Sequence, residues 1–315
     1  MLAYSLKRIL QLIVTTLGVV TLVFFTLRLI PGDAASAMAG DTLSGEALQR
    51  LREQMGLSRP LGEQYFSYLR GLLSFKLGET ITTGLSISSL LLSAIPITLT
   101  IALATITLAL SIAVPLGTMA AFMAHKGYRT LDNLITGAAM LADLMPSFWT
   151  ALVFLLLFSL TLGIFPASGT ISLEDPRAFL MRLALPVLVL SVTQIAAMAR
   201  ITRTAVLEVL SEDYIRTARS MGWSELQVLF RHALKNAALP IVTIVGLSFG
   251  SLLNGTVIVE FIFTIPGIGS LLVYGINSRD YQLVQTLIVF YALIFVTVNF
   301  VTDLVYKKLD PRVQF

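Results

Sequence analysis

The amino-acid sequence predicts an all-α membrane protein with six transmembrane helices. Of its 315 residues, 56% are hydrophobic and only 13% are charged, whereas soluble domains carry about 25% charged residues. A helix needs about 20 apolar residues to cross the hydrocarbon layer. Six stretches have about this length: 9–30, 94–123, 134–162, 183–199, 237–260 and 284–306. A polar, basic stretch, 200–239, separates the fourth from the fifth and predicts one large loop.

The first apolar stretch follows Lys7 and Arg8, as the core of a signal peptide would. It is longer than such a core, and no small-residue cleavage site precedes Arg28, so we expect a retained helix. Residues 46–55 and 62–73 have mixed polarity and predict two short amphipathic helices on or near the outer membrane face, with irregular loop as the alternative. We therefore expect an N-terminal part, 1–92, and a five-helix core, 93–315.

The distribution of Lys and Arg predicts the orientation. If the amino terminus is cytoplasmic, the inner side carries 13 Lys and Arg residues and the short outer loops carry 3. Short cytoplasmic loops are enriched in these residues. We therefore expect both termini and the large loop to be cytoplasmic.

Local sequence signals predict two helices in the large loop. Ser211 is a candidate cap for the first helix, and Glu212 and Asp213 lie where the helix dipole favours acids. Gly222 provides a left-handed stop. Ser224 and Gln227 have the spacing of a capping box, which starts a second helix running toward Pro240.

The first of these helices is predicted to be amphipathic. Tyr214, Ala218 and Met221 share one face by their spacing, and Arg216 and Arg219 share another. Such a helix is suited to contact a partner outside the membrane. A basic helix facing lipid headgroups is the alternative.

Several kinds of chemistry are not expected in this chain. No Gly-x-x-x-x-Gly-Lys-Ser/Thr sequence occurs, so any ATP must bind to another chain. Cysteine is absent, and only His125 and His232 offer imidazole groups, so we expect neither a metal site nor a catalytic site. We also expect no nucleic-acid binding, because no basic face with base-reading residues is visible.

Asp143 lies about nine residues into the third apolar stretch, which a straight helix would place about 14 Å deep. An ionisable group at that depth marks a functional site by default. Together with the neighbouring Met145, it is predicted to line a translocation path, where it would meet a peptide amino group. The equally weighted alternative is a structural carboxylate bonded to a neighbouring helix.

Small residues of the fifth stretch are expected to serve helix packing, because small-xxx-small pairs let helices approach closely in lipid. We expect contact with a second membrane subunit, and a contact within the chain is the alternative. The residues concerned are Gly246, Gly250, Ser251 and Gly255.

The loop resembles a known family. The sequence Glu212-Asp213-Tyr214-Ile215-Arg216-Thr217-Ala218-Arg219, then Gly222 and Arg231-His232-Ala233-Leu234-Lys235-Asn236-Ala237, is similar to the cytoplasmic coupling loop of ABC importer permeases of the dipeptide, oligopeptide and nickel branch. Further matches cover nearly the whole chain: Arg28-Leu29-Ile30-Pro31-Gly32-Asp33, Gly56-Leu57-Ser58-Arg59-Pro60-Leu61, Met145-Pro146-Ser147-Phe148-Trp149, Glu260-Phe261-Ile262-Phe263 and Leu309-Asp310-Pro311-Arg312. Phe75-Lys76 departs from the Gly-Asp usual in this family.

The resemblance implies a type I ABC importer permease fold. The implied partners are a second homologous permease, two cytoplasmic ATPase subunits that bind ATP and Mg, and an extracytoplasmic substrate-binding protein. The chain itself would hold no cofactor and would not be an enzyme. The implied coupling residues are Glu212, Asp213, Tyr214, Arg216, Thr217, Ala218, Arg219, Gly222, His232 and Asn236.

Alternative functions differ in what they require of the sequence. A secondary transporter or channel predicts inverted repeats and several buried ionisable groups, whereas this chain shows one clear mid-membrane acid and no obvious repeat. An intramembrane hydrolase would need nucleophile or metal motifs that are missing. Peptides are the expected cargo; a nickel chelate, glutathione or a sugar would use the same permease pattern.

Overall fold

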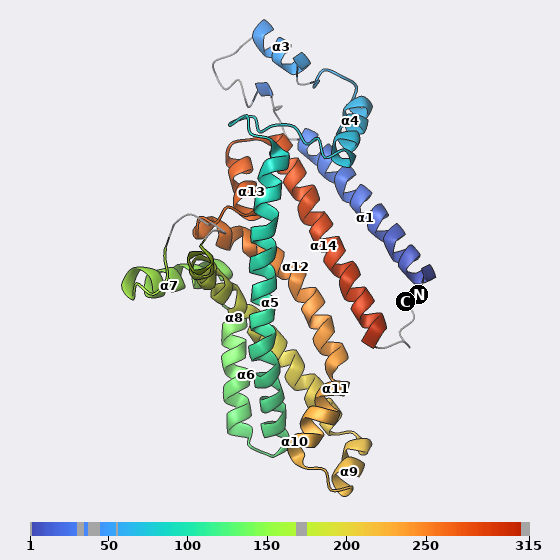
Figure 1. The fold of residues 1–315 in the computed structure, drawn as a ribbon, viewed down its shortest axis with the longest axis vertical. Coiled ribbons are helices and arrows are strands. Elements are labelled where there is room, and N and C mark those ends of the chain that lie inside the picture. The colour runs from blue at the N-terminus through green and yellow to red at the C-terminus, as the bar shows by residue number, and fades with distance from the viewer. Residues whose placement is uncertain (1, 30–34, 37–44, 55, 168–174, 310–315) are drawn as a thin grey trace. The chain divides into compact units, whose positions relative to one another are not determined.

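The computed structural model describes residues 2–29, 35–36, 45–54, 56–167 and 175–309, and the statements below concern these residues (Figure 1). They form helices connected by short turns, without a β-sheet. The helices of the first 161 residues are α1 (Leu2–Leu29), α3 (Glu46–Gln54), α4 (Leu61–Leu73), α5 (Ile87–His125), α6 (Arg129–Asp143), α7 (Ser147–Phe154) and the π-helix η1 (Leu155–Thr161). The remaining helices are α8 (Pro176–Leu210), α9 (Asp213–Ser220), α10 (Glu225–Gln227), the π-helix η2 (Val228–Ala233), α11 (Leu234–Asn236), α12 (Ala238–Ile262), α13 (Ile268–Asn277) and α14 (Tyr281–Leu309).

Five of these helices are long and apolar enough to span a membrane: α1, α5, α8, α12 and α14. The third predicted stretch, 134–162, is not one straight helix. It consists of α6 and of α7 with η1, which are bent by 97° at a short break. Pro146 forms the N-cap of α7 with an extended backbone, and a proline cannot donate the backbone hydrogen bond that continuing α6 would require. Together the bent pair qualifies as a sixth span.

The chain divides into two compact units. One contains residues 1–98 and 265–297, and the other contains residues 99–264 and 298–315. The predicted division between residues 92 and 93 concerns domains and stays a prediction.

The first unit confirms the two short amphipathic helices, as α3 and α4. Its core joins the start of α5, through Ile87 and Leu91, to Ile268 of α13 and Leu283 of α14. Phe75, which replaces the usual family glycine, has a left-handed backbone with φ 55°. This conformation costs a non-glycine residue about 1–2 kcal/mol, so the departure places strain in the turn after α4.

In the second unit, α5 and α8 cross closely at Gly117. A Cβ atom there would clash with the backbone oxygen of Ala199 and the side chain of Thr202. Small residues on both helices, including Ala109, Ala113 and Ala199, continue this contact. Helices in lipid associate through such small residues because their backbones can then pack closely. This crossing fixes α8, which carries the large loop at its end.

Candidate coupling surface and cavity

The large loop is shorter than predicted, because α8 continues to Leu210. Arg200 and Arg203 are therefore helix residues and do not belong to the loop. They bind acids of α6: Arg200 Nη2 lies 2.8 Å from Asp143 Oδ2, and Arg203 binds Asp132 with two nitrogens. Ser211 is also placed differently. It is the C-cap residue of α8, and its hydroxyl donates to the Glu208 carbonyl over 2.6 Å.

The first loop helix, α9, is anchored by one apolar face. Ile215 and Ala218 are buried against α8 residues such as Val206 and Leu210, and against Ala121 of α5. Of the predicted shared face of Tyr214, Ala218 and Met221, Tyr214 and Met221 are exposed and only Ala218 is buried. The buried face of α9 consists of Ile215 and Ala218. Glu212 is the N-cap residue, Asp213 occupies the first turn and Thr217 is exposed.

The turn after α9 matches the predicted signals. Gly222 has a left-handed backbone, with φ 84°, and no atom lies within 4 Å of where its Cβ would be. The Ser224 hydroxyl accepts a hydrogen bond from Gln227 N, and the Gln227 side chain accepts one from Ser224 N. This is the predicted capping box, and it starts the second loop helix at Glu225.

A cluster of charged groups ties this turn to the end of α5. Arg219 Nη2 lies 2.9 Å from His125 Nε2 and 3.5 Å from Glu225 Oε2. Lys126 Nζ lies 3.0 Å from the other oxygen of Glu225. The Lys126 hydrogen bond, the largest influence, holds the pKa of the Glu225 carboxyl below its usual value. The carboxylate is thus charged at neutral pH, and its contribution is lost only in acid. Arg216 and Arg219, predicted to share a face, have different partners: Arg219 is half-buried beside Glu225, whereas Arg216 is exposed beside Asp213.

The second half of the loop returns to the first. Asn236 Nδ2 donates to the hydroxyl of Tyr214 over 2.8 Å, which joins two predicted coupling residues 22 positions apart. The His232 ring packs edge-on against Trp223 at a centroid distance of 5.0 Å, and Arg231 lies over the same indole. His232 therefore has a structural role in the loop.

The outer side of the loop presents large apolar side chains. The exposed fraction is 42% for Tyr214, 73% for Met221, 63% for Leu226 and 60% for Phe230. Exposed apolar side chains of this size are normally scattered over a protein surface, whereas these four belong to one loop. We call these four residues the loop's apolar set. The sequence interpretation did not identify Leu226 and Phe230. Their four-residue spacing was the available signal.

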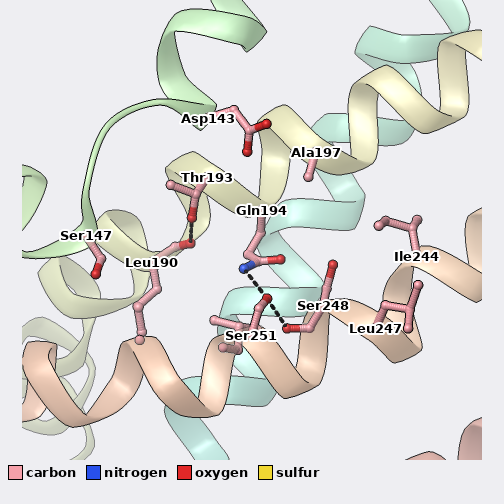
Figure 2. Close-up of a pocket in the computed structure, with 12 residues that line it drawn as sticks. Asp143, Ser147, Leu190, Thr193, Gln194, Ala197, Ile244, Leu247, Ser248 and Ser251 are labelled. Atoms are coloured by element: carbon pink, nitrogen blue, oxygen red, sulfur yellow. Dashed lines mark hydrogen bonds between the residues drawn. The ribbon is translucent and has the colours of Figure 1, made fainter.

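A cavity of about 450 Å³ lies in the second unit (Figure 2). Its walls come from α8 and α12, with the break between α6 and α7 at one side. Figure 2 shows Gln194 of α8 reaching Ser251 of α12, and its Nε2 donates to Ser251 Oγ over 3.3 Å. Ser251 Oγ in turn donates to the Ser248 carbonyl over 2.9 Å. The remaining lining residues are Asp143, Ser147, Leu190, Thr193, Ala197, Ile244, Leu247, Leu252 and Gly255.

Asp143 is the last residue of α6 and lines the cavity, and it also forms the ion pair with Arg200 of α8. Its role in a translocation path and its depth in the membrane stay predictions. Met145 lies in the break and is not one of the cavity's lining residues.

The small residues of α12 have neighbours within the chain. A Cβ at Gly246 would clash with Thr302 of α14, and a Cβ at Gly255 would lie 3.2 Å from Leu190 Cδ2 of α8. Gly250 is half-buried. At Gly246 and Gly255 the small residue therefore serves a contact within the chain, which was the alternative to a contact with a partner subunit.

The helical membrane fold, the basic loop and the adjacent cavity are typical of a membrane transport subunit. Two family models match the chain. Residues 113–315 match the binding-protein-dependent transport system inner membrane component, and residues 1–102 match the N-terminal model of the corresponding membrane component. The chain belongs to this family, whose members are ABC importer permeases.

Curated relatives extend over the full chain. A di/tripeptide transport system permease protein of Pseudomonas aeruginosa is 38% identical over 340 residues, covering 100% of this chain and 99% of the relative. An oligopeptide transport system permease protein of Bacillus subtilis is 35% identical over 319 residues, covering 100% of both. A chain of the MetNI methionine ABC transporter, solved in inward-facing conformations, has a TM-score of 0.58 at 17% identity and covers 70% of this chain and 96% of its own. This last likeness concerns the fold.

Proposed function

We propose that this chain is the membrane-spanning subunit of an ATP-driven importer for peptides, which an external binding protein delivers. The observation that carries the proposal is the arrangement of loop and cavity. The loop connects α8 to α12, and the same two helices form most of the cavity wall. A displacement of the loop is therefore transmitted directly to the wall of the cavity.

The loop supplies the docking surface for the ATPase. The apolar set, Tyr214, Met221, Leu226 and Phe230, would enter a groove on an ATPase subunit, and Asp213 and Arg216 would lie at its rim. Well-packed apolar anchors within a polar rim provide most of the binding energy at protein interfaces. The ion pairs of Glu225 and the apolar face of α9 hold the surface rigid, so movement of the ATPase is not absorbed within the loop. ATP and Mg would bind to that partner, two copies of which would serve this chain and a second permease.

The chemistry of the cavity favours a peptide cargo. Hydroxyl and amide groups of Thr193, Gln194, Ser248 and Ser251 can donate to and accept from peptide groups without selecting a side chain. The Asp143 carboxylate lines the cavity and would bind a free amino terminus, while Arg200 of α8 holds it in place through the ion pair. A volume of about 450 Å³ lies within the range of small-ligand sites, about 300–1,000 Å³. The names of the two curated relatives, which concern di/tripeptides and oligopeptides, support the same cargo.

Removing the charge of Asp143 tests this assignment. Asp143→Asn should lower ATP-driven peptide uptake about tenfold or more, because a hydrogen bond to a charged group contributes about 1.5–3 kcal/mol. Uptake would be measured in proteoliposomes that contain the assembled transporter and its loaded binding protein. Glu79→Gln, an exposed carboxylate of the first unit, is the control and should leave uptake unchanged. Unaltered uptake of several peptides by Asp143→Asn would assign the residue a structural role only. Uptake that persists without ATP would favour a secondary transporter.

The orientation is tested by labelling cysteines introduced into this cysteine-free chain. Ser58 and Ser220 are both exposed. With an impermeant thiol reagent on intact cells, Ser58→Cys should react and Ser220→Cys should be protected. This result requires both cytoplasmic termini and a bent α6–α7 pair that crosses the membrane. If both cysteines react, the bent pair does not cross and the six-span topology is wrong.

A further inference from the structure

A second cavity lies in the first unit. It has a volume of about 460 Å³ and lies among the end of α1, the turn before α4, α4 itself and the start of α14. Its charged and polar lining residues are Arg28, Arg59, Glu63, Gln64, Ser67, Tyr68, Tyr281, Gln282 and Gln285. Its lining includes residues of two sequence motifs, one around Arg28 and one at Gly56–Leu61. The proposed transport function does not explain either motif.

Two buried polar groups of this cavity lack partners. Gln285 is only 6% exposed, and its Nε2 has no hydrogen-bond partner; the Tyr68 hydroxyl has none either. Gln285 is near enough to Tyr68 to act on its pKa, but the two side chains do not form a hydrogen bond of normal geometry. Burial, the dominant effect, raises the pKa of Tyr68 to about 12, so the hydroxyl keeps its proton. Buried donors without an acceptor are rare and call for an explanation.

Arg28 adds a positive charge beside these two donors. Its guanidinium donates to Gln64 Oε1 and to the Phe24 carbonyl and lies 3.5 Å above the Phe24 ring. Within the described residues, it has no carboxylate partner. Gln64 is itself held by the Leu57 and Arg59 carbonyls, at 3.0 and 2.9 Å. The guanidinium is therefore fixed in place, and an anionic oxygen acceptor would satisfy all three donors.

The position of the cavity indicates where this acceptor comes from. The span of α1 ends at Leu29 and the span of α14 begins at Tyr281, so the cavity lies at a membrane boundary. Along α4, Leu61, Phe66 and Leu73 expose 52%, 71% and 90% of their surface, as expected for a helix that lies in the interface between headgroups and acyl chains. Phospholipid phosphates occupy this level. Glu63 is the one acidic residue in the lining, against Arg28 and Arg59. The cavity therefore keeps an excess of positive charge.

We propose that this cavity binds the phosphodiester headgroup of a membrane phospholipid, with Arg28, Tyr68 and Gln285 donating to its oxygens. The bound lipid would tie α1 and α4 to the start of α14. The role of the bound lipid would be to hold the N-terminal helix α1 in place, since α1 contributes no lining residue to the transport cavity.

Native mass spectrometry and thermal unfolding of the purified full chain test the site. After delipidation, phosphatidylglycerol should be retained as one molecule per chain and should raise the unfolding midpoint. Monogalactosyl diacylglycerol, which has similar tails and no phosphate, should do neither. Arg28→Gln and Gln285→Met should each weaken phosphatidylglycerol retention about tenfold or more. Arg50→Gln, which removes an exposed charge that pairs with Glu46 outside the cavity, should retain the lipid as the unmodified chain does.

Gln285→Met also separates lipid binding from a structural role. In lipid-free detergent this variant should be as stable as the unmodified chain or more stable, because it removes a buried donor without a partner. Addition of phosphatidylglycerol should then stabilise the unmodified chain alone. Equal loss of stability with and without lipid, equal retention of the galactolipid, or binding of inorganic phosphate as tight as that of the lipid would each overturn the proposal.

Discussion

Gly222→Val is expected to reduce ATP-driven uptake at least tenfold while the permease still inserts and assembles. The φ of 84° leaves space for a side chain but imposes a backbone that is unfavourable for valine. The cost is about 1–2 kcal/mol, and the chain would relieve it by tilting α9 relative to the helix that begins at Glu225. The apolar set would then lose its fixed arrangement.

Arg219→Glu should have a comparable effect for an electrostatic reason. It removes the contact with His125 and places a second carboxylate beside Glu225. ATPase retention on the purified complex, ATP hydrolysis stimulated by loaded binding protein, and cargo uptake would be measured in parallel. Gly84→Val is the matched control, because Gly84 has φ 67° and equally open surroundings in the other unit. If both loop variants keep all three activities, the loop is not the coupling element and its basic surface contacts lipid instead.

Arg203→Leu should cost about 3 kcal/mol or more of stability, the largest effect expected in the membrane core of the second unit. Asp132 is buried, and Arg203 binds both of its carboxylate oxygens from α8. Removing one member of a buried ion pair leaves the other charge without compensation, at a cost of about 3–5 kcal/mol. Thermal unfolding in detergent or nanodiscs would measure the loss.

The double variant Asp132→Leu with Arg203→Leu should recover most of this stability, because two apolar residues replace the pair without leaving a charge. Arg50→Gln provides the comparison with an exposed pair, which contributes at most about 1 kcal/mol. A double variant no more stable than Arg203→Leu alone would show that the pair does not act as a unit.

The parts of the structure that could be predicted depend on neighbours in sequence. The left-handed turn at Gly222 and the capping box of Ser224 and Gln227 follow from local backbone chemistry, and both are present. The partners of Arg200 and Arg203 lie 57 and 71 positions away. A charged residue with no partner nearby in the sequence is expected to face water. The sequence therefore predicts that both arginines belong to the loop.

The buried face of α9 and the break in the third apolar stretch could not be predicted, for related reasons. Spacing alone groups residues into faces but does not say which face meets the protein. Ile215, one position beyond Tyr214, is completely buried in the cluster that includes α5 and α8. The apolar run from 134 to 162 is continuous in composition, so hydropathy does not register the break that Pro146 introduces.

The break between α6 and α7 determines the parity of membrane crossings. Five straight spans are an odd number, so by themselves they would place the two ends of the chain in different compartments. The bent pair makes the number even only if its two arms, joined by Leu144, Met145 and Pro146, carry the chain from one surface to the other. The compartment of every residue after α7, including the large loop, is thus decided by the path of this bent segment.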